Sequence, residues 1–129
     1  MQSRSIVSPR SVSLVALTPA LTLVGIVAAA LAGCRSLPPS KPEALWTIEE
    51  ARGAQVFHQA CAKCHYPTTT RGLKGPGLQA ITKVKAMPSG APPTDERLTS
   101  TILRGRGMMP ATQLTDNQLS DLLAYLHSL

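Results

Sequence analysis

The sequence is poor in aromatic residues and in cysteine. Its 129 residues include one Trp, one Phe and two Tyr, and only three Cys. A small domain with so few large apolar side chains has difficulty in assembling a sufficient core, and such domains usually recruit a metal, disulfides or a cofactor. The sequence therefore predicts that something other than ordinary side chains completes the interior.

Several sequence patterns are absent as well. There is no internal repeat, no glycine-rich phosphate loop and no alternation of the kind that strands show. Lys and Arg outnumber Asp and Glu by 13 to 7, but the basic residues are neither clustered on one helix nor interleaved with stacking aromatics. These absences argue against a nucleic-acid partner and favour an all-α domain with long loops.

Charge is missing from residues 11–33, which follow Arg4 and Arg10. A basic start before an uncharged apolar run is typical of an export signal. The run ends in small residues before Cys34, and this ending resembles the lipobox of bacterial lipoproteins. The resemblance implies cleavage after Gly33 and a lipid anchor on Cys34. A retained transmembrane helix over residues 11–33 is the alternative, because a run of this length could span a bilayer.

The chain is thus predicted to consist of three parts. An export leader covers residues 1–33, a lipidated and extended linker covers residues 34–45 because of its prolines, and one folded domain covers residues 46–129. Either fate of the leader puts the domain outside the cytoplasmic membrane, where thiols are not kept reduced. We expect a membrane-anchored lipoprotein on the periplasmic side of a bacterial cell envelope.

Apolar residues at helical spacing and capping signals predict three helices. Thr47 and Glu50 form one capping box. Thr115 and Gln118 form another, and Thr94 caps a segment with two acids in its first turn. The long stretch between the first and second helices is rich in Gly and Pro and is predicted to be mainly loop. The expected helices run from about 48 to about 65, from about 95 to 104, and from the second capping box nearly to Leu129.

The stretch CAKCH, residues 61–65, combines two cysteines and a histidine. On a helix, Cys61 and Cys64 lie on one face, so both sulfurs can reach one flat object beside it. Cys-x-x-Cys-His is the attachment signature of c-type haem, in which His65 binds the iron. Zinc would need four ligands, and a thioredoxin-like pair belongs with a βαβ pattern that is missing. Haem is favoured, with a redox pair and zinc as alternatives.

With this motif, the chain from about residue 46 to 129 resembles a small class I cytochrome c, as in bacterial monohaem electron carriers. The resemblance implies an all-α fold around one covalent haem c with its iron. It further implies thioethers on Cys61 and Cys64 and an iron ligand in His65. Within the GPGL loop, the carbonyl of Pro76 is expected to orient the imidazole.

The same resemblance implies a methionine as the sixth ligand, directly before a proline. GRGMMPA offers Met108 and Met109, and the Met-Pro register favours Met109. In this family the first helix crosses the last through a small and an aromatic residue. The matching residues here are Gly53 and Phe57, which would pack against Tyr125 and Leu126. The two remaining histidines are expected to be solvated: His58 and His127.

Two axial ligands leave no open position on the iron, so we expect transfer of single electrons and no catalysis. The favoured function is a membrane-tethered carrier between extracytoplasmic donor and acceptor proteins. One alternative is a haem subunit of a larger dehydrogenase or oxidase complex. The other is a haem peroxidase or gas sensor in which Met109 is displaced. Basic residues near an exposed haem edge could steer an acidic partner, with these as candidates: Lys63, Arg71, Lys74, Lys83, Lys85, Arg104 and Arg106.

Overall fold

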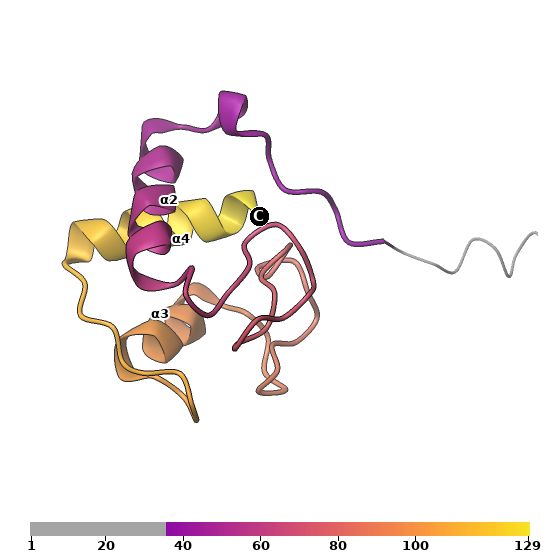
Figure 1. The fold of residues 1–129 in the computed structure, drawn as a ribbon, viewed down its shortest axis with the longest axis vertical. Coiled ribbons are helices and arrows are strands. Elements are labelled where there is room, and N and C mark those ends of the chain that lie inside the picture. The colour runs from indigo at the N-terminus through magenta and orange to yellow at the C-terminus, as the bar shows by residue number, and fades with distance from the viewer. Residues whose placement is uncertain (1–35) are drawn as a thin grey trace, which may run out of the picture. The chain divides into compact units, whose positions relative to one another are not determined.

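The computed structural model describes residues 36–129, so the leader and Cys34 lie outside the described residues. This part is all α, as predicted, and its β-type pairing is limited to one isolated bridge. None of its helices is both long and apolar enough to cross a bilayer. The elements are a 3₁₀ turn η1 (Glu43–Leu45) and the helices α2 (Ile48–Ala60), α3 (Asp95–Arg104) and α4 (Asp116–Ser128) (Figure 1).

The capping residues begin the helices where the sequence predicted. Both capping boxes form: the Thr47 side chain accepts from the N–H of Glu50, while the Glu50 carboxylate accepts from the N–H of Thr47. Thr115 opens α4 in the same way. Thr94 caps α3, which ends at Gly105 with a φ of 73°. A side-chain oxygen at each start satisfies an N–H that has no partner inside the helix.

The predicted end of α2 was wrong, because the helix stops at Ala60 and not near His65. The N–H groups of Cys61 and Ala62 both donate to the Phe57 carbonyl, at 2.8 and 3.0 Å, and this shared acceptor ends the regular ladder. Turns continue through the motif: the N–H groups of Cys64 and His65 both donate to the Cys61 carbonyl at 3.0 Å. The CAKCH stretch is therefore a series of turns and not a helix face.

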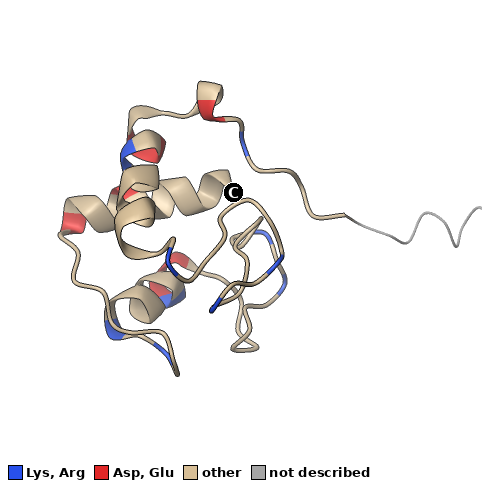
Figure 2. Cartoon of the chain, in the orientation of Figure 1, with Lys and Arg blue, Asp and Glu red and all other residues tan. Residues whose placement is uncertain are grey.

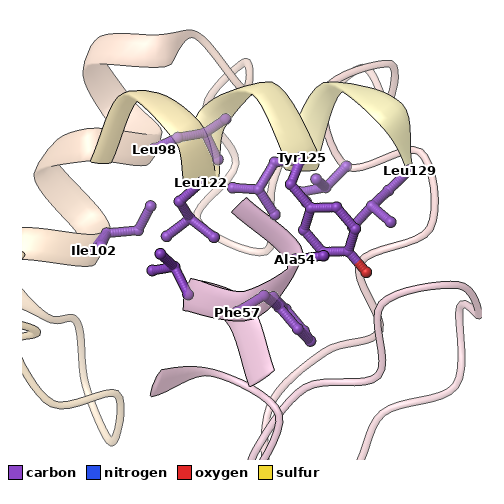
Figure 3. Packing of buried hydrophobic residues seen from close by; sticks show 10 residues of the cluster. Ala54, Phe57, Leu98, Ile102, Leu122, Tyr125 and Leu129 are labelled. Carbon is purple, nitrogen blue, oxygen red and sulfur yellow. The ribbon is translucent and has the colours of Figure 1, made fainter. Parts of the chain in front are cut away.

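Close contact between α2 and α4 forms the centre of the core (Figure 3). A Cβ on Gly53 would collide with the Asp121 carbonyl and would lie 2.7 Å from Tyr125 Cβ, so only glycine permits this approach. One turn later Phe57 is fully buried, with its ring centroid 5.5 Å from that of Tyr125. Leu126 belongs to the same buried cluster. The helix crossing implied by the resemblance is present.

Residues 38–46, which we call the strap, are bound to the domain. The Lys41 N–H donates to the Ser128 carbonyl at 2.7 Å, and the Gln79 side chain donates to the Pro38 carbonyl at 3.1 Å. The linker expected over residues 34–45 is therefore not free beyond residue 37. Proline favours an extended backbone, but an extended segment can still donate to and accept from a neighbouring surface.

Trp46 fastens the other end of the strap. Its indole N–H donates to the Lys41 carbonyl at 3.0 Å, and its ring meets Tyr125 edge-on with centroids 5.3 Å apart. Aromatic pairs in this edge-to-face arrangement add stability beyond the area that they bury. The strap thus joins α2 to the last turns of α4.

Replacing Glu50 with glutamine is expected to weaken the dependence of the unfolding free energy on pH in the acid range. The Glu50 carboxylate accepts from Lys41 Nζ at 2.7 and 3.0 Å, and this bond, with that from Thr47, holds its pKa below the usual range. A depressed folded pKa stabilises the native state above the unfolded pKa of about 4.3. That contribution disappears as pH falls through the folded value.

Urea unfolding of the wild type and Glu50→Gln at neutral pH and at about pH 3.5 measures this effect. At neutral pH the free energy of unfolding of the variant should be about 1–2 kcal/mol lower than that of the wild type, since the partner is a charged donor. This difference between the two proteins should become smaller in acid. Glu43→Gln, which changes a strap residue near Lys41 in sequence, serves as the control. If the difference in unfolding free energy stays constant with pH, the ion pair is not its cause.

Candidate functional site

The two cysteines of the CAKCH turns are free and half-buried. Cys61 packs against the buried cluster. Burial, with a smaller effect of nearby Cys64, raises the pKa of the Cys61 thiol to about 11. Reactive redox cysteines have lowered pKa values, because the thiolate is the nucleophile. This environment argues against a thioredoxin-like pair.

His65 follows directly, and its ring is held by the backbone of the GPGL loop. Nδ1 lies 2.8 Å from the Pro76 carbonyl oxygen, which has no proton to give, so Nδ1–H is the donor. The other ring nitrogen, Nε2, is then the basic one and can bind a metal. The loop is itself fixed to the motif, because the Gly75 N–H donates to the Cys64 carbonyl at 2.8 Å.

Gly75 forms a seat against which the imidazole lies. A Cβ at this position would collide with Cε1 of His65 and would lie 2.9 Å from each ring nitrogen. Any other residue would push the ring away from the Pro76 carbonyl. Glycine at this position leaves space for the ring, and the next carbonyl, that of Pro76, accepts its hydrogen bond. The loop therefore orients one imidazole.

The turn on either side of this seat is closed by contacts that the sequence did not reveal. The Leu78 N–H donates to the Tyr66 carbonyl at 2.9 Å, and the Arg71 guanidinium lies 5.2 Å from the Tyr66 ring centroid. A Cβ on Gly77 would lie 2.6 Å from the Arg71 carbonyl oxygen. A cation over an aromatic ring inside an irregular loop has no periodic signature, so pattern analysis does not find it.

The methionine loop between α3 and α4 contains a tight hairpin. Arg106 and Met109 exchange two backbone hydrogen bonds, at 2.9 and 3.0 Å. Gly107 is the first central residue of this two-residue turn, with a φ of 57°, a position that favours glycine. Met108 is at the tip and 93% exposed, whereas Met109 is half-buried against the core. The hairpin therefore gives these adjacent methionines opposite environments.

At Gly105 the backbone packs closely against residues 109–111, where the chain leaves the hairpin. A Cβ on Gly105 would lie 2.8 Å from Ala111 N and 2.9 Å from the Pro110 carbonyl carbon. The Thr112 N–H then donates to the Ile102 carbonyl at 3.0 Å, which ties the end of the loop to α3. Met109 is thus held in a loop with both ends fixed.

The remaining histidines lie apart from this site. His58 is exposed and meets the Phe57 ring edge-on. His127 is also exposed, but it pairs with Asp95 at 2.8 Å and so links α4 to α3, a contact that the sequence did not predict. Within residues 36–129 no three His, Cys, Asp or Glu side chains are grouped to share a metal ion, whereas structural zinc takes four ligands.

These residues fit a covalently held haem c. The CAKCH turns carry two thiols directly before an imidazole whose Nε2 is left free for a metal, and the Gly75 seat fixes that ring. Cys61 and Met109 are the first and the last of these candidate haem-binding residues along the chain, and both pack against the same buried cluster. The other partly buried apolar side chains at this cluster include Ala62, Leu78, Val84, Met87 and Leu103.

Comparison with known families agrees with this arrangement. The family model described as "Cytochrome C oxidase, cbb3-type, subunit III" matches residues 49–126. The matched segment begins in the first turn of α2, ends in the last turns of α4 and contains the CAKCH turns, the GPGL loop and the methionine loop. No curated protein matches the chain.

Proposed function

The chain belongs to this family of c-type cytochromes, whose haem c transfers electrons, and we propose that it is a membrane-tethered monohaem electron carrier. The hydrogen bond of His65 Nδ1 to the Pro76 carbonyl carries the proposal. A bond of this kind selects the metal-binding nitrogen and the ring angle, and such partners matter nearly as much as the ligands. Neither the redox-pair nor the zinc hypothesis explains why a loop is shaped around one imidazole.

Each residue of the set has a distinct proposed role. Cys61 and Cys64 form the thioethers, and His65 binds the iron through Nε2. Pro76 orients that ring. Met109 supplies a soft sulfur ligand, which favours the ferrous state and raises the reduction potential. Bound haem supplies an iron that changes its oxidation state by one electron.

With His65 and Met109 both holding the iron, no position on it would remain for a substrate. The domain would then pass electrons between donor and acceptor proteins outside the cytoplasm without performing bond chemistry. Cytochrome c domains are extracytoplasmic, which agrees with the export leader predicted over residues 1–33. We propose that a lipid on Cys34 provides the tether.

A second candidate function follows from the family description. The matching family is that of subunit III of a cbb3-type cytochrome c oxidase, so a haem subunit in a larger oxidase complex is the alternative to a separate carrier. Size-exclusion chromatography of gently solubilised membranes separates the two. A carrier elutes near the mass of the single chain, whereas a subunit elutes with haem-containing partners.

Mass spectrometry of the exported, matured protein tests the main proposal. We expect one haem attached to the peptide that contains residues 61–65, and a low-spin spectrum with a methionine-to-iron band in the ferric form. Replacing both Cys61 and Cys64 with alanine is the control, because its haem should be extracted by acidified solvent. A colourless protein, or wild-type haem that acid extracts equally well, would contradict the proposal.

Basic residues dominate the loops around the site. No Asp or Glu occurs between residues 51 and 94, and in Figure 2 the acidic residues are on the helices and the strap. The helix acids are partly neutralised, since Arg52 donates to Asp121 at 2.7 and 2.9 Å. We propose that the loop charge attracts an acidic partner.

Salt should therefore slow oxidation of the reduced protein by ferricyanide, which is anionic. Exposed charges are screened beyond about 10 Å at 0.1 M salt, so the stopped-flow rate should fall as ionic strength rises. A cationic cobalt complex of similar potential should show the opposite trend. Oxidation rates that do not change with ionic strength for either reagent would contradict electrostatic steering.

A further inference from the structure

The strap leaves little free chain between the domain and its proposed anchor. The bond from Gln79 to the Pro38 carbonyl fixes the chain to the domain from Pro38 onward. From Cys34 to Pro38 is four residues, and an extended chain spans at most about 3.6 Å per residue, or about 14 Å here. A free linker over residues 34–45 would have reached about 40 Å by the same measure.

The chain leaves the domain at a definite place, the C-terminal end of α4. The strap binds the carbonyl of Ser128 through Lys41, and the N–H of Ala80, next to Gln79, donates to the carbonyl of Leu129. Two separate segments therefore meet the last residues of α4. Figure 1 shows the strap passing this end of the helix.

Two exposed lysines follow Gln79 closely along the chain. The Lys83 N–H donates to the Ala80 carbonyl, so Lys83 lies within one turn of Gln79, and both Lys83 and Lys85 are exposed. Glu43 is the single acid of the strap and lines the same surface hollow as Gln79. The Lys41 ammonium is already paired with a carboxylate. Lysine side chains of this kind suit the headgroups of anionic lipids.

We propose that this surface, the anchor face made of Pro38, Gln79, Lys83 and Lys85, rests on the membrane and gives the domain one orientation there. The proposal rests on the lipid at Cys34 within the proposed function. It deepens that function, because a domain held within about 14 Å of its anchor is a stationary relay and not a carrier with a long reach.

The orientation has a consequence for the route of electrons. The methionine loop leads into the N-terminal end of α4, whereas the anchor face lies at its C-terminal end. A helix of 13 residues is about 20 Å long at 1.5 Å per residue. Figure 1 shows the connection from α3 entering one end of α4 and the strap passing the other end. In the proposed orientation the methionine loop therefore faces the aqueous side, where a partner can reach it.

Lysine footprinting on vesicles tests the anchor face. The acylated holoprotein is bound to phosphatidylcholine–phosphatidylglycerol vesicles, labelled with a membrane-impermeant acetylating reagent and mapped by mass spectrometry. The matched variant carries a flexible Gly/Ser insertion of about 20 residues between Leu37 and Pro38, which adds about 25 Å of average reach. We expect Lys83 and Lys85 to be acetylated several-fold more slowly in the wild type than in the variant, with Lys63 unchanged.

Flotation of the vesicles is measured first, so that two failures are distinguished. Protein that does not float has no lipid anchor, and this overturns the proposed tether together with the anchor face. Protein that floats but shows equal acetylation of Lys83 and Lys85 with and without the insertion overturns the anchor face alone. Equal slowing of Lys63 would likewise overturn it, because the membrane would then cover a different surface.

Discussion

Replacing Met109 with alanine is expected to abolish the methionine-to-iron band of the ferric protein, while Met108→Ala leaves the band in place. The hairpin is the reason: Met109 is half-buried against the core, whereas Met108 is 93% exposed at the tip. Loss of a soft sulfur ligand removes its preference for ferrous iron. Each tenfold of that preference is worth about 59 mV, so we expect the potential to fall by on the order of 100 mV.

Spectra of the ferric proteins and a redox titration measure both effects, after mass spectrometry has confirmed covalent haem in each variant. Carbon monoxide should also bind the ferrous Met109→Ala protein readily, because one iron position is then open. Loss of the band in Met108→Ala alone would shift the ligand by one residue. Retention of the band in both variants would contradict Met109 as the specific sixth ligand. Either methionine could then bind the iron in place of the other, or neither binds it.

Gly53→Ala should destabilise the domain severely, although alanine is the better helix former. The added methyl group has no space, because it would overlap the Asp121 carbonyl and approach Tyr125. Propensity alone would favour alanine by about 1 kcal/mol. Overpacking costs about 1–3 kcal/mol and more where backbone is the obstacle, so we expect a net loss of about 2 kcal/mol and a Tm lower by roughly 10 °C.

Thermal unfolding of the holoprotein measures this loss, and Ala51→Gly is the matched control. Residue 51 is exposed on the same helix, so its change reports propensity without packing, at about 0.5–1 kcal/mol. A Gly53→Ala protein as stable as the wild type would mean that α2 and α4 can separate without loss. The helix crossing would then be far looser than the structure shows.

The parts of the fold that the sequence predicted are those determined by neighbouring residues. Thr47 begins α2, and Thr94 and Thr115 begin α3 and α4, because a capping side chain reaches only the next few N–H groups. The CAKCH spacing is local in the same sense, and it identified the candidate site. The end of α3 at residue 104 was expected as well, and Gly105 directly after it adopts a φ of 73°.

Contacts between distant segments could not be predicted in this way. The sequence extended α2 to about residue 65. The helix in fact stops where Cys61 and Ala62 share the Phe57 carbonyl, a geometry without a residue signature. The prolines of the strap indicated a free linker, because composition does not show which carbonyl lies nearby. The GPGL loop was recognised in the sequence, but the contact of Gly75 with the imidazole became visible only in the structure.

The closed end of α4 implies that the domain opens as a unit. The last carbonyls of a helix have no partner inside it, but here Ser128 and Leu129 accept from Lys41 and Ala80. Ala80 keeps this bond although its φ of 53° is uncommon for a residue with a side chain. Fraying of α4 must therefore release the beginning and the middle of the domain together, so hydrogen exchange at the Lys41 and Ala80 amides should be as slow as at the core amides of α4.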